Sequence, residues 1–229
     1  MTDHARDLEA VREATDRLLS AMGTMDDGTV AEPSRLPGWS RGHVLAHLSR
    51  NADALANVLQ GRPMYANSET RDADIERDAP RPLAAQLADL RTSGAAFLAA
   101  AGTTVDWSRT VTMRNGVTDS ASRVPFRRWI EVELHHVDLG VGYELEDLPD
   151  EFVTRENDFL ADRFAGHPAV ALTTAVAADG RRWTTGGGAD GAPVTVRGTA
   201  AGILGWLCGR RDGSELAVEG GGLPTLPPL

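Results

Sequence analysis

The chain has little of three things: cysteine, long apolar runs and excess positive charge. Its single cysteine, Cys208, excludes an intrachain disulfide and fits a reducing compartment. No segment approaches the ~20 apolar residues that a membrane helix needs. The polar start at residues 1–7 also lacks the apolar core of a signal peptide. We therefore expect a cytoplasmic protein that does not enter a membrane.

The shortage of positive charge also limits the classes of molecule that the protein is expected to bind. The formal net charge is -10 and the pI is near 5.0. Nucleic acid as a main partner is therefore not expected, because phosphate binding needs a basic face. With 229 residues, 41% of them hydrophobic and 24% charged, the chain can bury its own core as one large or two small domains.

The first part of the chain is dominated by helical periodicity. Apolar residues recur at three- and four-residue spacing in four long segments, which predicts an up-and-down four-helix bundle over residues 1–147. The polar segment 61–82 is expected to be a loop or an irregular crossover that could cover a cleft. Residues 105–124 alternate like strands around Asn115-Gly116, a hairpin turn dipeptide. The four expected helices span residues 3–22, 41–60, 83–101 and 125–143.

The composition changes at Leu148-Pro149, and residues 148–229 are predicted to form a small α+β domain. One helix is expected over 150–164 and a second, shorter one from Thr199 to Cys208, with Gly209 ending it. Strand-like runs occupy 169–177, 181–185, 193–197 and 216–218. The predicted fold class is therefore α+β, with a helical bundle followed by this smaller domain.

The fourth helix carries the chemistry. Glu131 and His135 are four residues apart and share one helix face, so both can reach one metal ion. His47, on the second helix, is the best candidate for a third ligand, and ligands from facing helices converge inside a bundle. Two imidazoles and one carboxylate are the donor set of open catalytic zinc sites, although other divalent ions also suit it. His43 competes with His47 for the role of third ligand.

Neighbouring ionisable groups are weaker candidates. Glu133 and His136 point away from the face that Glu131 and His135 share. Asp138, one turn further on, could orient His135, and a surface or capping role would explain it equally well. Arg50, close to the His47 face, is expected to be a surface group.

Three stretches give the chain a family resemblance. They are Leu36-Pro37-Gly38-Trp39 with Ala46-His47-Leu48, the run Arg71-Asp72-Ala73-Asp74-Ile75-Glu76, and Glu131-Val132-Glu133-Leu134-His135. Together with Trp206-Leu207-Cys208-Gly209-Arg210, they resemble the mycothiol-dependent maleylpyruvate isomerase family. The resemblance implies a DinB-like four-helix bundle with a small α+β C-terminal domain. It also implies Zn²⁺ held by His47, Glu131 and His135.

The same resemblance implies an activity. The family converts maleylpyruvate to fumarylpyruvate with mycothiol, a low-molecular-weight thiol, as cofactor. Its substrate is a small dicarboxylate. An arginine of the C-terminal domain takes part, and Arg210 matches it best, with the adjacent Arg211 as the alternative. Two other functions stay open: a mycothiol S-transferase acting on another electrophile, and a metal-binding module without catalysis.

Overall fold

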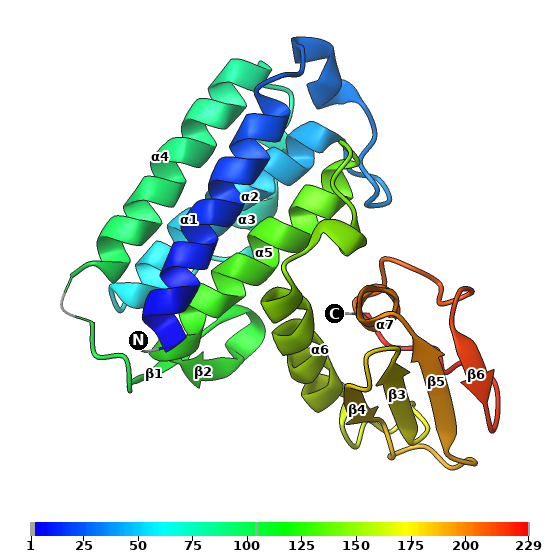
Figure 1. The fold of residues 1–229 in the computed structure, drawn as a ribbon. Helices are drawn as coiled ribbons and strands as arrows, with labels where there is room; N and C mark the ends of the chain where they lie inside the picture. Colours follow the sequence, from blue (N-terminus) through cyan, green and yellow to red (C-terminus); the bar gives the residue numbers. More distant parts are fainter. Residues whose placement is uncertain (1–2, 104, 229) are drawn as a thin grey trace. The chain divides into compact units, whose positions relative to one another are not determined.

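The computed structural model describes residues 3–103 and 105–228 and separates them into two compact units, with the division between Tyr143 and Glu144. Figure 1 traces the chain through both. The domain boundary predicted after Asp147 remains a prediction. Across the described residues, none of the helices has the length and apolar character required to cross a bilayer.

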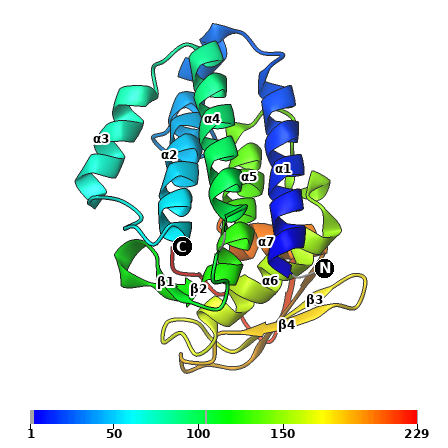
Figure 2. The same ribbon diagram turned by 90° about the vertical axis from the view of Figure 1, so that its left-hand side faces the viewer.

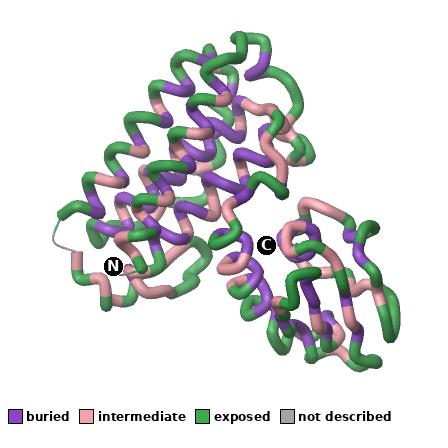
Figure 3. The backbone as a smooth tube through the Cα atoms, in the orientation of Figure 1, coloured by how far each residue is buried: buried purple, intermediate pink, exposed green. Residues whose placement is uncertain are grey.

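Four long helices lie side by side in the first unit (Figures 1 and 2). Their inner faces carry the buried residues, which Figure 3 shows as purple segments that face the neighbouring helices. Burying these apolar faces against one another is what stabilises helices of this kind. The predicted helical domain is therefore confirmed. The helices are α1 (Asp3–Met22), α2 (Arg41–Leu59), α4 (Leu83–Ala101) and α5 (Val124–Leu139).

Local signals in the sequence set the ends of α2 and α5. Ser40 caps α2: its side chain accepts a hydrogen bond from the His43 N–H, and its own N–H donates to His43 Nδ1. Gly140 ends α5 in a left-handed conformation (φ 65°), which glycine adopts without steric cost. Helix α5 thus stops before Tyr143, earlier than expected.

Residues 61–82 contain a helix that the sequence reading missed. Helix α3 (Ser68–Asp78) begins at Asn67, whose side chain accepts from the Thr70 N–H, and packs against α2. The expectation of a loop was wrong here because the segment has almost no apolar periodicity. Only Ile75 and Asp78 are buried in α3. The helix depends on its cap and on ion pairs rather than on a wide apolar face.

The predicted hairpin is present but short. Strand β1 (Thr110–Thr112) pairs antiparallel with β2 (Thr118–Ser120). The turn between them contains Asn115 and Gly116 with φ of 58° and 74°, the left-handed conformations that this dipeptide favours. The hairpin follows α4 and leads into α5 through a short 3-10 turn. The 3-10 segments of this unit are η1 (Asp27–Ala31), η2 (Arg114–Gly116) and η3 (Ala121–Arg123).

The second unit is a mixed four-stranded sheet with two helices, as the α+β prediction required. Its strand order is β4-β3-β5-β6: β3 and β5 are parallel and the other two pairings antiparallel. Strands β3 and β4 occupy the C-terminal parts of the expected runs, and β5 and β6 begin and end one residue later than expected. The elements are η4 (Leu145–Asp147), α6 (Asp150–Phe164), β3 (Thr173–Ala177), β4 (Arg182–Thr185), β5 (Val194–Gly198), α7 (Ala200–Leu207) and β6 (Ala217–Glu219).

Candidate metal centre

The structure brings His47, Glu131 and His135 together. His47 Nε2 lies 2.9 Å from Glu131 Oε2, and His135 Nε2 lies 3.3 Å from the same oxygen. One ligand atom from each residue falls within 4.8 Å of the others. Helix α5 supplies two of them because residues four apart stack on one face, and α2 supplies the third because it packs directly on α5.

This group fits a divalent cation in composition and in access. Two imidazoles and one carboxylate leave one coordination position free on a tetrahedral ion, as catalytic zinc sites do. The side chain of His47 is 8% exposed and that of His135 12%, whereas Glu131 is 31% exposed. The two imidazoles are therefore nearly buried, and the carboxylate is the part of the centre that solvent reaches most.

Asp138 fixes the orientation of His135. Its side chain is fully buried, and its Oδ2 lies 2.8 Å from His135 Nδ1. A carboxylate accepts at that distance, so Nδ1 carries a proton and Nε2 is the nitrogen that faces Glu131. Burial lowers the pKa of His135, but hydrogen bonds to Asp138 and Glu131 outweigh it and raise the pKa overall. Of the two roles considered for Asp138, the structure supports orientation of His135.

His47 is held from its other side by a cation. Arg71, on α3, places Nη2 3.1 Å from His47 Nδ1. Burial, with contributions from His135 and Arg71, lowers the pKa of His47 to about 4 despite the opposing effect of Glu131. Burial raises the pKa of Glu131, but hydrogen bonds from the two histidines more than reverse this and hold it well below its usual value. A neutral imidazole and an ionised carboxylate are the forms that bind a cation.

The competing ligands lie elsewhere. His43 uses Nδ1 in the α2 cap, and its Nε2 is 3.4 Å from Glu76. Glu133 is fully buried but accepts from Trp129 and from the Tyr143 hydroxyl, away from the triad. Residues that share a helix face are therefore not all available to bind a metal ion. His43 is engaged in capping α2, whereas His47 is not.

His136 is also buried away from the centre. Its ring stacks on Tyr143 with the centroids 4.1 Å apart. This agrees with helix geometry, because successive residues are rotated by about 100° and His136 therefore points away from the face of His135. His136 therefore belongs to the packing between helices.

Arg50 was expected to be a surface group, and that expectation was wrong. Its guanidinium makes ion pairs of 2.9 Å with Asp78 and Asp89 and of 3.0 Å with Asp53. The side chain is 19% exposed. Arg50 links α2 to α3 and α4, and it is not a free cation for substrate.

Arg210 and Arg211 follow the end of α7 in the second unit. Arg210 Nη1 donates to the backbone oxygen of Cys208 at 3.0 Å. Arg211 pairs with Glu146 through both terminal nitrogens, at 2.7 and 2.8 Å. A two-point ion pair thus occupies Arg211, and the assignment of Arg210 to the site remains a prediction.

Sequence reasoning assigned no site role to three residues near the triad: Tyr65, Arg71 and Arg128. Arg71 touches His47, and Arg128 lies one turn before Glu131 on the same face of α5. That spacing was the available signal, since a cation three residues before Glu131 lies on the same face of the helix. Tyr65, in a segment expected to be loop, carried no such signal.

Two family descriptions cover almost the whole chain. Residues 11–140 match the mycothiol maleylpyruvate isomerase N-terminal domain, and residues 147–228 match the C-terminal domain of the same family. No curated protein sequence matches this chain.

Solved structures agree with these matches. A crystal structure of the mycothiol-dependent maleylpyruvate isomerase is 26% identical, with a TM-score of 0.89, covering 99% of this chain and 97% of that one. A structure of a histidine-to-alanine mutant of such an enzyme is also 26% identical, with a TM-score of 0.88 and the same coverage. The similarity thus extends through both units.

Proposed function

Because the chain belongs to the mycothiol maleylpyruvate isomerase family, we propose that it is a zinc- and mycothiol-dependent isomerase that converts maleylpyruvate to fumarylpyruvate. The observation that carries the proposal is the convergence of His47, Glu131 and His135 at one centre, with the carboxylate as the part that solvent reaches most. A buried, three-donor centre of this composition suits a cation that must also accept a small ligand.

The reaction requires rotation about a carbon–carbon bond that is double in the substrate, so that bond must first become single. A thiolate that adds to the conjugated carbon makes that bond single and moves an electron pair onto the neighbouring carbonyl as an enolate. Rotation followed by loss of the thiolate gives the trans product, so the thiol is regenerated. The thiol therefore acts as a cofactor and is not consumed.

In this mechanism the chain supplies positions and charges. His47, Glu131 and His135 would hold the zinc ion, which when bound lowers the pKa of a thiol that reaches it. Asp138 keeps the His135 proton on Nδ1, so that Nε2 stays a donor atom. Arg210 is proposed to pair with a substrate carboxylate or with the enolate charge, for which guanidinium is suited.

The test is to purify the protein, measure bound metal, and assay maleylpyruvate turnover with and without mycothiol. We expect about one zinc ion per chain, as one three-donor centre requires, and turnover that depends on mycothiol. Equal turnover without any thiol would reject the mechanism. Accumulation of a thiol adduct in place of fumarylpyruvate would instead identify an S-transferase, and a metal-containing protein inactive towards every electrophile would leave a binding module.

A further inference from the structure

Arg128 is a charged side chain in the interior of the helical unit. It is completely buried, and its Nη1 donates to the Leu48 carbonyl and to Asn51 Oδ1, each at 2.8 Å. Its Nε and Nη2 find no hydrogen-bond acceptor among residues 3–103 and 105–228. These two nitrogens form the edge of a guanidinium that binds a carboxylate through two parallel hydrogen bonds. Leaving such an edge unpaired inside a protein is costly, which calls for an explanation.

The position of Arg128 ties it to the metal centre. It precedes Glu131 by three residues on α5, so both side chains lie on one face of the helix. Burial lowers its pKa to about 10, against the charges of Glu131, Tyr65 and Asp53. Arg128 therefore keeps its positive charge at neutral pH, one turn before Glu131 on α5.

A second cation approaches the same region from α3. The Arg71 side chain is 10% exposed, and its guanidinium lies over the Tyr65 ring at 5.9 Å from the centroid. Arg71 also donates to His47 Nδ1 at 3.1 Å. Its Nη1 pairs with Asp72 Oδ1 at 2.6 Å. Arg71 thus brings a second guanidinium from α3 to the edge of the triad.

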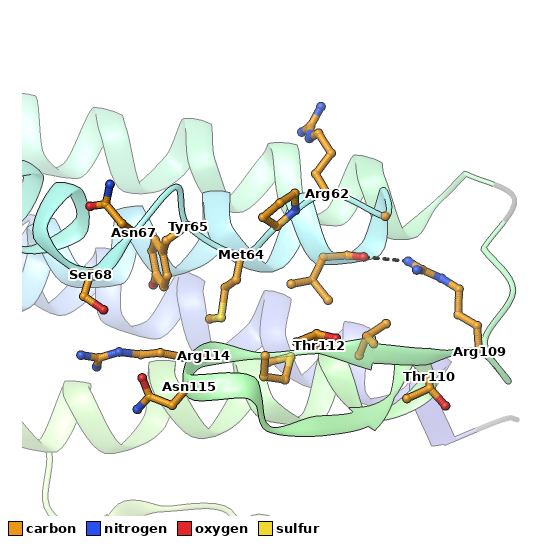
Figure 4. A pocket seen from close by; sticks show the side chains of 15 residues that line it. Arg62, Met64, Tyr65, Asn67, Ser68, Arg109, Thr110, Thr112, Arg114 and Asn115 are labelled. Atoms are coloured by element: carbon orange, nitrogen blue, oxygen red, sulfur yellow. Dashed lines mark hydrogen bonds between the residues drawn. The ribbon is translucent and has the colours of Figure 1, made fainter.

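Tyr65 borders space that a small molecule can occupy. It lines a cavity of about 270 Å³ together with Arg71, and a second one of about 540 Å³ beside the β1–β2 hairpin. In Figure 4 Tyr65 hangs from the α2–α3 connection above the hairpin turn, where Arg114 lies below it. The larger cavity has the size of a small-molecule site. Its walls include apolar groups, among them Met64, Val58 and Val111.

The charges around this corner favour an anion. Arg71 and Arg128 contribute two positive charges and a bound divalent ion would add two more. Glu131, Asp72 (which pairs with Arg71 at 2.6 Å) and Asp53 (whose charge acts on Arg128) contribute three negative charges. This local excess contrasts with the net charge of -10 for the whole chain. A carboxylate supplies the missing charge and two acceptor oxygens in the spacing that the free edge of Arg128 presents.

We propose that Arg128 and Arg71, with the Tyr65 hydroxyl, bind a carboxylate of the substrate beside the metal centre. This assigns the helical unit a carboxylate site of its own, in addition to the contact proposed for Arg210. The inference rests on the proposed function for the identity of the substrate, a dicarboxylate. The existence of the carboxylate site does not depend on the proposed function, because the site is built from Arg128, Arg71 and Tyr65.

The experiment measures maleate binding to the zinc-loaded protein by titration calorimetry, without any thiol. Maleate carries two cis carboxylates and cannot be isomerised in the absence of a thiol. We expect Arg128→Met to weaken maleate binding by about tenfold or more, because a charge-assisted two-point contact is lost. Arg71→Gln should weaken it less, and Arg128→Lys should restore part of the loss because it keeps the charge.

Two controls separate this site from general effects. Arg91→Gln removes an exposed positive charge on α4 and should leave maleate affinity unchanged. Zinc content should be equal in all variants, which would show that a loss of maleate affinity is not caused by a loss of metal from the triad. Arg128→Met should also keep or raise the melting temperature, since a buried cation with unpaired donors is replaced by an apolar side chain of similar length.

The outcomes are separable from those of the isomerase assay. Arg128→Met that binds maleate as the wild type does would overturn the carboxylate site, even if the protein isomerises maleylpyruvate. Wild-type protein that fails to bind maleate would overturn it as well. Loss of maleate binding in Arg128→Met, with no maleylpyruvate turnover in the wild type, would support the site and point to a different carboxylate substrate.

Discussion

Asp138→Asn tests how the metal centre is organised, because it changes one charge without changing the size of the side chain. In the native protein Asp138 Oδ2 accepts from His135 Nδ1 at 2.8 Å, inside the core. An asparagine can present its NH₂ group instead, and a donor there favours the opposite tautomer of His135. The proton would then sit on Nε2, which is the nitrogen that faces Glu131.

The expected cost follows from what the contact does. Loss of an orienting carboxylate behind a histidine ligand weakens metal binding by about 10- to 100-fold, which is about 1.4–2.7 kcal/mol. A second effect opposes it, because Asp138 helps to raise the pKa of His135 and its removal reduces competition from protons. Working at a pH above the raised pKa of His135, where its imidazole is neutral, keeps that second effect small.

The assay is a zinc competition titration against a chromophoric chelator, with wild type and variant compared at one pH. Glu76→Gln is a matched control: Glu76 also faces a histidine, His43, at 3.4 Å, but lies outside the triad. It should leave zinc affinity unchanged. Equal affinity in Asp138→Asn and wild type would refute the orienting role, and a loss in Glu76→Gln of the same size would show that any carboxylate near a histidine has this effect.

Three further predictions concern the triad and the fold. His47→Ala should lose both bound zinc and isomerase activity, measured by metal analysis and turnover; unchanged zinc content would remove His47 from the ligand set. Zinc affinity should fall about tenfold per pH unit below the raised pKa of His135, because one proton must leave before the metal binds. The fall should steepen near pH 4, where His47 also takes up a proton, and affinity independent of pH would contradict this reading. Gly42→Ala should lower the free energy of unfolding in urea by about 3 kcal/mol, since its Cβ would lie 2.1 Å from the Ala79 oxygen and 2.6 Å from Val30.

Much of the fold could be predicted because the spacing of apolar residues along the sequence follows which face of each element is buried. The long helices were found from apolar spacing, and the hairpin from Asn115-Gly116, whose backbone preference is local. Helix α3 was missed because its stability comes from the Asn67 cap and from charged contacts, which leave no apolar pattern. The lesson is physical: a helix that buries little surface leaves little trace in the sequence.

The candidate site also has parts that local sequence patterns predict and parts that depend on tertiary packing. Sequence alone placed Glu131 and His135 on one face of a helix, because helix geometry is the same in any fold. His47 was already the preferred third ligand, with His43 left open, and only the packing of α2 on α5 could show that His47 is the imidazole that reaches Glu131. Packing alone also brought Arg71 to His47 and left one edge of Arg128 unpaired, because contacts between distant segments follow from the assembled core and not from spacing along the chain.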